Sequence, residues 1–209
     1  MTKFILASSS KYRQQLLSNV GINVDTFSPA IDETPKPNES PVALSKRLAT
    51  EKAKKVAQQF PQHIVIGSDQ VAVVETDDGT QVLGKPGTVD NALKQLKLCQ
   101  GKLVNFYTSL SLCQFNQHNK LPAISVTRVE ETNVHFRTHS EQQLRAYINK
   151  EMPLDCAGSF KCEGIGVLLF ERISSRDPNT LIGLPVMLLH NMLDKHFGID
   201  LLNIATETN

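Results

Sequence analysis

The chain has 209 residues, of which 40% are hydrophobic and 21% charged, values typical of a globular protein with a sizeable core. Lys and Arg number 22 against 21 Asp and Glu, so the net charge of +1 argues against a general attraction to nucleic acid or to a membrane surface. No apolar run reaches the length of a membrane span, and Phe4 to Ala7 is too short for the core of a signal peptide. The four cysteines form no CxxC pair and have no histidine at zinc-finger spacing, so we expect reduced thiols in a cytoplasmic protein.

The first half of the chain alternates between strand and helix patterns. We expect a buried strand at 3–7, a helix from the serines at 8–10 to Gly21, and a strand at 22–28. A proline-rich loop follows, and Ser40 with Pro41 begins a long helix that reaches about Phe60. Residues 63–74 are predicted as a strand with a polar break, followed by a hairpin turn at Asp78-Gly79 and a helix at 88–101.

The second half begins with two long strand candidates, 103–115 and 125–137, joined by a polar turn at 116–120. Ser140 with Gln143 forms a capping-box pattern for a helix through Lys150. A strand at 166–173 and a final helix at 183–198 complete the pattern. Strands that alternate with helices, plus one hairpin, predict an α/β fold with a mixed sheet. We expect a single domain over 1–202 and a flexible tail at 203–209.

Asp69 lies at the centre of the strand-forming run IVIGSDQVAV, residues 64–73. An ionised carboxylate left unpaired beside a core costs several kcal/mol, so such a group is paired, bound to a metal or shifted in pKa. The alternative is that Asp69 caps a turn and binds nothing.

Lys52 lies on the apolar face of the long predicted helix, between Leu48 and Val56. A lysine in that position either extends along the apolar surface to a nearby solvent edge or meets a buried anion.

Five loops carry residues suited to a ligand site, which in an α/β sheet usually lies at the ends of strands. They are SSSKYR at 8–13, DET at 32–34, GSDQ at 67–70, GKP at 84–86 and AGSFKCEG at 157–164. Two of them have a plain alternative, since the serines of SSSKYR could only cap a helix and Gly-Lys-Pro could form an ordinary turn. The sequence contains no GxxxxGK[ST], GxGxxG, GxSxG or HExxH motif, and we assign the six histidines no role.

Taken together and in order, seven motifs resemble the Maf family of nucleoside triphosphate pyrophosphatases, over Phe4 to about Phe197. The motifs are ILASSSKYRQQLL, DET, EKA around Lys52, GSDQ, GKP, LDCAGSFKCEGIG and NTLIGLP. GSDQ and AGSFK with the following Glu-Gly are similar to the branch that hydrolyses 7-methyl-GTP. Where that branch often has tryptophan, this chain has Tyr12.

The resemblance implies cleavage between the α- and β-phosphates of a nucleotide, giving a monophosphate and diphosphate. It implies a divalent cation, Mg²⁺ or alternatively Mn²⁺, and a homodimer that acts on a small molecule rather than on nucleic acid or membrane. The fold it implies is an elongated mixed sheet flanked by helices, with two lobes and a central cleft, as in Maf and ITPase proteins.

The resemblance also suggests roles for individual residues. Asp69 is the expected proton acceptor, and Glu33 and Asp69 are the expected metal ligands. The expected phosphate-binding residues are Ser8, Arg13, Lys52, Lys85 and Lys161. The expected specificity residues are Tyr12, Gln70 and Glu163.

Two alternatives stay open at this point. One is a pyrophosphatase for other nucleotides, of the dTTP/UTP or inosine type. The other is a regulator of septum formation that acts through protein partners and exposes an apolar patch. The aromatic content of 6% favours an enzyme over such a partner-binding surface.

Overall fold

A computed structural model describes residues 4–116 and 121–206. The chain divides into two compact units, each assembled from separate segments. Unit 1 consists of Met1–Asp69, Thr108–Glu130 and Asp177–Asn209, and unit 2 of Gln70–Tyr107 and Glu131–Arg176.

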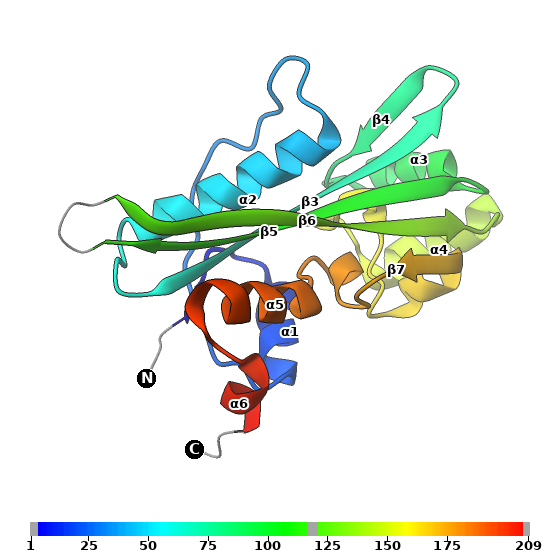
Figure 1. Cartoon of the computed structure of the whole chain (residues 1–209). Helices are drawn as coiled ribbons and strands as arrows, with labels where there is room; N and C mark the ends of the chain where they lie inside the picture. Colours follow the sequence, from blue (N-terminus) through cyan, green and yellow to red (C-terminus); the bar gives the residue numbers. More distant parts are fainter. Residues whose placement is uncertain (1–3, 117–120, 207–209) are drawn as a thin grey trace. The chain divides into compact units, whose positions relative to one another are not determined.

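The strands belong to one mixed sheet with the order β2-β1-β3-β5-β6-β7, and β4 pairs with β3 (Figure 1). Their bounds are β1 Phe4–Leu6, β2 Asp25–Thr26, β3 Ile64–Thr76, β4 Gly79–Leu83, β5 Leu103–Phe115, β6 Pro122–Phe136 and β7 Phe170–Ser175. β1 is parallel to β2 and β3, whereas the β3–β4 and β6–β7 pairs are antiparallel. The predicted mixed α/β fold, with helices flanking the sheet, is confirmed.

The helices begin largely where their capping residues predict. Their bounds are α1 Lys11–Asn19, α2 Pro41–Ala57, α3 Val89–Cys99, α4 Glu141–Glu151, α5 Val186–Phe197 and α6 Leu201–Thr206. Ser10, Ser40 and Thr88 cap α1, α2 and α3 through their side-chain oxygens. The predicted capping box of Ser140 and Gln143 is present at α4.

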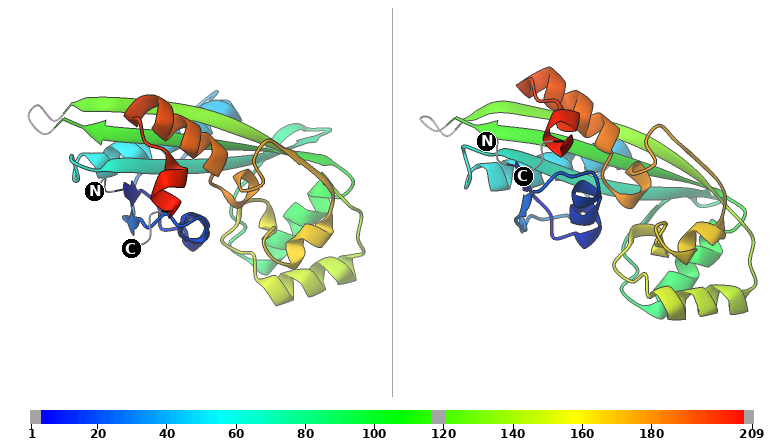
Figure 2. Two further views of the ribbon diagram at one scale, coloured as in Figure 1. Left: turned by 60° about the horizontal axis from the view of Figure 1, so that its bottom comes forward. Right: turned by 90° about the horizontal axis from the view of Figure 1, so that it is seen from below.

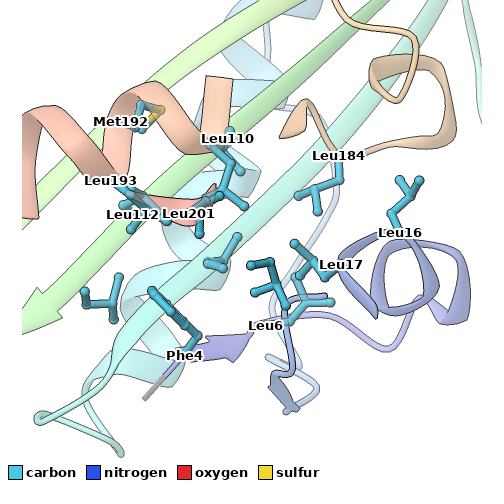
Figure 3. Packing of buried hydrophobic residues seen from close by; sticks show 14 residues of the cluster. Phe4, Leu6, Leu16, Leu17, Leu110, Leu112, Leu184, Met192, Leu193 and Leu201 are labelled. Atoms are coloured by element: carbon cyan, nitrogen blue, oxygen red, sulfur yellow. The ribbon is translucent and has the colours of Figure 1, made fainter. Parts of the chain in front are cut away.

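The core of unit 1 lies on both faces of its strands, with α2 on one face and α1 and α5 on the other (Figures 1 and 2). Successive residues of β3 point to opposite faces. Ile64 and Ile66 join the large cluster of Figure 3, in which Leu6 and Leu17 pack with Leu184. Val65 joins a second cluster, on the α2 face. Both faces of β3 are therefore covered, which explains why its sequence is apolar without strict alternation.

Unit 2 is built around an aromatic cluster. Phe106, Phe136 and Phe170 surround Phe160, with ring centroids 5.4, 6.0 and 4.8 Å from that of Phe160, and all contacts are edge-to-face. Unit 2 also contains the helices α3 and α4 and two short 3₁₀ segments, η1 Ala157–Ser159 and η2 Ile165–Leu169. A further 3₁₀ segment, η3 Thr180–Ile182, belongs to unit 1.

Several predicted elements differ from the structure. β3 is continuous from Ile64 to Thr76 rather than broken, and β2 is much shorter than the predicted strand at 22–28. The first part of the predicted strand at 166–173 is the 3₁₀ segment η2, and β7 begins only at Phe170. Of the segment expected as a flexible tail, residues 203–206 belong to α6, and 207–209 lie outside the described residues.

The α6 helix is held in place because Leu201 is buried in the core of unit 1. The predicted turn at 116–120 lies outside the described residues except for Asn116. Among the residues that the structure describes, none of the helices has the length and hydropathy needed to cross a membrane.

Candidate active site

Lys52 of α2 bridges two carboxylates. Its Nζ lies 2.6 Å from Oδ1 of Asp69 and 2.7 Å from Oε1 of Glu33. The side chains of Lys52 and Asp69 are only 9% and 10% exposed, whereas that of Glu33 is 53% exposed. The inward-facing lysine therefore meets a buried anion, and the interpretation in which it only extends to solvent is wrong. The interpretation in which Asp69 caps a turn is wrong as well.

A glycine explains why this lysine and this aspartate come together. A Cβ on Gly67 would clash with the carbonyl oxygen of Ala49 and lie 2.8 Å from the amide nitrogen of Ala53, both in the backbone of α2. Only glycine lets β3 approach the helix so closely. Because strand side chains alternate with a period of two, Asp69 points to the same face as Gly67 and meets Lys52 there.

Burial raises the pKa of the Asp69 carboxyl above its ordinary value, and the charge of Glu33 acts in the same direction. The Lys52 ammonium opposes this most strongly, through its charge and its hydrogen bond, and the Arg13 guanidinium opposes it more weakly. A carboxylate with a raised pKa is a stronger base than one in water. The environment of Asp69 therefore suits a group that accepts a proton.

Arg13 is held beside β3 by main-chain oxygens. Its Nε donates to the carbonyl of Gly183 at 2.8 Å, and its Nη1 donates to the carbonyl of Ser68 at 2.7 Å. Burial lowers the pKa of the guanidinium, while Asp69 and Glu33 raise it. Within residues 4–116 and 121–206 Arg13 forms no ion pair, so its charge is not neutralised by direct contact with a carboxylate.

Ser8 and Tyr12 lie beside Arg13 in the sequence, at the start of α1. The buried Ser8 accepts a hydrogen bond from the amide of Ser10 at 3.1 Å, and its Oγ is 3.5 Å from Nη1 of Arg13. Tyr12 is half-buried in the first turn of the helix. The structure thus brings Ser8, Arg13, Glu33, Lys52 and Asp69 into one part of unit 1.

The remaining predicted residues belong to unit 2. Gln70 is its first residue, half-buried directly after Asp69, and Lys85 is exposed in the loop between β4 and α3. Lys161 donates from Nζ to the carbonyl of Glu151 at 2.7 Å, at the C-terminal end of α4. Glu163 is exposed, and the thiol of Cys162 lies 3.6 Å from its Oε2.

Sequence reasoning missed Asp177, which is only 1% exposed. Its Oδ1 accepts from the amide of Asn179 at 2.8 Å, and its Oδ2 accepts from the amide of Met187 at 2.6 Å, in the first turn of α5. These bonds fix the loop whose Gly183 carbonyl receives Arg13. The Asp-Pro-Asn sequence is a turn signal, but nothing in it indicates burial.

The two carboxylates at Lys52 fit the way in which proteins usually hold Mg²⁺. Among the described residues no group of three or more His, Cys, Asp or Glu side chains is placed to hold a metal ion. Mg²⁺ is commonly bound by one or two carboxylates, with substrate phosphates and water supplying the other oxygens. Glu33 and Asp69 both contact the Lys52 ammonium in this structure. They are the oxygen donors that match this mode of binding.

The comparisons with known proteins agree with the sequence resemblance. The family described as Maf-like protein matches residues 3–196. A protein of Aliivibrio fischeri (strain ATCC 700601 / ES114) named 7-methyl-GTP pyrophosphatase is 45% identical over 201 residues, covering 96% of this chain and 99% of that protein. A solved structure of a HAM1 protein from Coxiella burnetii has a TM-score of 0.37 and 14% identity, over 78% of this chain and 89% of that one, which is too distant to bear on the fold. The family match and the full-length relative show that this chain belongs to the Maf family.

Proposed function

We propose that this protein is a nucleoside triphosphate pyrophosphatase that hydrolyses 7-methyl-GTP to 7-methyl-GMP and diphosphate. The observation that carries the proposal is the 45% identity, over nearly the full length of both chains, to a protein named 7-methyl-GTP pyrophosphatase. The geometry at Lys52 and Asp69 supplies groups that this chemistry needs.

In the proposed reaction, Asp69 accepts a proton from a water molecule, and the water oxygen attacks the α-phosphorus. The bond from the α-phosphorus to the oxygen that bridges the α- and β-phosphates breaks, and diphosphate leaves with the electron pair of that bond. The raised pKa of Asp69 supports this role, since a stronger base takes the proton more readily.

Charge neutralisation is the second requirement, because the triphosphate carries several negative charges. In unit 1 the Lys52 ammonium already pairs with Glu33 and Asp69, whose charges also act on the Arg13 guanidinium. We therefore propose that Lys85, Lys161 and a divalent cation, Mg²⁺ or alternatively Mn²⁺, supply the additional positive charge. Such a cation stabilises negative charge on phosphate oxygens. Glu33 and Asp69 would hold it, and Ser8 would donate a hydrogen bond to phosphate.

We assign recognition of the base to Tyr12, Gln70 and Glu163. The 7-methylguanine ring carries a positive charge, and stacking on the Tyr12 ring would add about 0.5–2 kcal/mol of cation–π attraction. A carboxylate accepts both donors of the guanine edge, N1–H and N2–H, in charge-assisted bonds. Glu163 is the proposed carboxylate, and the amide of Gln70 would help to position the nucleoside.

A panel of triphosphates with diphosphate detection tests the proposal. We expect the highest kcat/KM for 7-methyl-GTP, above GTP, UTP, dTTP and ITP, and activity that is lost with EDTA and restored by Mg²⁺. A preference for UTP, dTTP or ITP would instead favour one of the alternative substrate classes.

A single substitution tests the base assignment. Glu163→Gln has one acceptor oxygen and no charge, so it should lower the ratio of kcat/KM for 7-methyl-GTP over GTP. An unchanged ratio would show that Glu163 does not recognise the methylated base.

The homodimer and cytoplasmic location implied by the family resemblance stay predictions. Light scattering coupled to size-exclusion chromatography would measure the oligomeric state.

A further inference from the structure

The loop that carries Glu33 has little packing of its own. Residues 31–40 contain no helix or strand, and most of their side chains are exposed. Segments with so few buried contacts open at low free-energy cost. Nevertheless Oε1 of Glu33 lies 2.7 Å from Nζ of Lys52. Other contacts must therefore hold this loop against α2.

Arg47 of α2 supplies those contacts. Its Nε and Nη2 donate to Oε1 and Oε2 of Glu39 at 2.7 and 2.9 Å, a two-pronged arrangement that fixes both side chains. Nη2 also donates to the carbonyl oxygen of Thr34 at 3.0 Å, and Thr34 directly follows Glu33. The guanidinium therefore ties both ends of the loop to one point on the helix.

Glu39 extends the connection into the loop. Its Oε2 accepts from the amide of Lys36 at 3.0 Å, so the same carboxylate bonds Arg47 and the middle of the loop. The side chains of Arg47 and Glu39 are only 15% and 9% exposed. The hydrogen bond from Arg47 lowers the pKa of Glu39 from 4.5 to about 2, so the carboxylate stays charged at pH values at which a free glutamate is protonated.

We propose that Arg47 and Glu39 are positioning residues that hold the loop at 32–39 so that Glu33 stays on Lys52 and beside Asp69. This rests on the proposed function, in which Glu33 helps to hold the divalent cation. Neither Arg47 nor Glu39 touches the reacting atoms, and their effect on catalysis passes through Glu33.

Arg47→Gln removes the charge and the two-pronged bond. Mutation of a residue that orients a metal ligand typically lowers metal affinity or activity by about 10–100-fold. We therefore expect the Mg²⁺ concentration for half-maximal activity to rise by about tenfold in Arg47→Gln. The loss of kcat at saturating Mg²⁺ should be smaller. Arg47→Lys keeps the positive charge but cannot form the two-pronged bond to Glu39. Its Mg²⁺ concentration for half-maximal activity should lie between those of wild type and Arg47→Gln. Arg145→Gln, which breaks a 2.8 Å ion pair with Glu141 in unit 2, is the matched control and should behave as wild type.

Two readouts separate positioning from general stabilisation. Hydrogen exchange should speed up at the amide of Lys36 in Arg47→Gln, while amides of β3 keep wild-type rates. Mn²⁺ binding to the free protein, followed by electron paramagnetic resonance, should weaken in Arg47→Gln and not in Arg145→Gln. Both measurements need no turnover, so they remain informative even if 7-methyl-GTP is not the substrate.

A double-mutant cycle is the decisive test. If Arg47 acts through Glu33, then Arg47→Gln should add almost nothing to the loss of activity already caused by Glu33→Gln. The proposal would be overturned if Arg47→Gln lowered activity by the same factor in the wild-type protein and in Glu33→Gln. It would also be overturned by an unchanged hydrogen-exchange rate at the Lys36 amide in Arg47→Gln. Failure of the proposed function would appear differently, as a wild-type protein without 7-methyl-GTP activity.

Discussion

Lys52 and Asp69 meet where α2 crosses β3, with 2.6 Å between Nζ and Oδ1, because Gly67 leaves no side chain between helix and strand. Both are buried, and the Asp69 carboxylate would be costly in the core without the Lys52 ammonium, whereas Lys52 also contacts Glu33. The contact therefore links the packing of the sheet to the charge state of the proposed base.

Asp69→Asn tests the role of that base. The change is nearly isosteric, and we expect kcat to fall by ~10²-fold or more because the general base is lost. The fold should be kept. Burial raises the pKa of Asp69 in the folded protein above its value in the unfolded chain. Ionisation of Asp69 therefore lowers the stability of the fold as the pH rises from the unfolded to the folded pKa. Steady-state kinetics and a melting curve at pH 8 measure both effects. Asp78→Asn, in the turn after β3, is the control, and wild-type turnover in Asp69→Asn would remove Asp69 from the mechanism.

Lys52→Met tests the pairing itself. The substitution leaves the Asp69 carboxylate buried without its ammonium, which raises the pKa of Asp69 further. Removing one partner of a buried ion pair typically costs about 3–5 kcal/mol, and we expect a loss towards the lower end at pH 8. The loss should shrink as the pH falls and Asp69 becomes protonated.

Urea unfolding of Lys52→Met, Asp69→Asn and the double variant measures the coupling between the two residues. The double variant should be more stable than Lys52→Met, because the unpaired carboxylate is gone. Lys55→Met, which replaces an exposed lysine on the same helix, is the control. A Lys52→Met protein as stable as wild type at pH 8 would show that the ion pair does not matter to the fold.

Gly67→Ala tests the close approach of α2 to β3. The added Cβ meets main-chain atoms of Ala49 and Ala53, which cannot turn aside as a flexible side chain would. We expect a destabilisation of about 1–3 kcal/mol and a fall in activity, because the helix that carries Lys52 must move away from Asp69. Gly84→Ala is the matched control, since a Cβ there would meet nothing within 4 Å. Equal unfolding free energies for the two variants would count against this explanation.

Local sequence signals were enough for part of this picture. Ser10, Ser40, Thr88 and Ser140 cap helices as their types predict, because a side-chain oxygen near a free helix amide is a short-range interaction. The inward position of Lys52 followed from helical periodicity alone. Local signals failed where glycines and tertiary packing decide the conformation. At Gly166 a Cβ would clash with the carbonyl oxygen of Lys161, and the chain there forms η2 instead of a strand.

The partners of the site residues could not be predicted, because they are far apart in the sequence. Arg13 donates to the carbonyl of Gly183, 170 residues away, and a main-chain acceptor leaves no trace in the residue type. The polar break expected in β3 is absent because Gly67 and Ser68 keep strand geometry while their contacts lie with α2 and with Gly183. The burial of Asp177 depends on the same folded loop.

The pH dependence of stability gives the last prediction, through Glu39. The hydrogen bond from Arg47, followed by that from the Lys36 amide, lowers the pKa of Glu39 from 4.5 to about 2. A depressed folded-state pKa means that the carboxylate stabilises the folded protein above the unfolded pKa of 4.5, and that this stabilisation is lost as the pH falls towards 2. The melting temperature of Glu39→Gln should therefore lie below that of wild type by a constant amount between about pH 6 and 8. Below pH 4.5 the gap should narrow, because the wild-type carboxylate is progressively neutralised as well. Glu171→Gln, at an exposed position of β7, is the control and should track wild type throughout. If the difference in melting temperature between wild type and Glu39→Gln stayed constant down to about pH 3, the contacts of Glu39 would not depend on its charge.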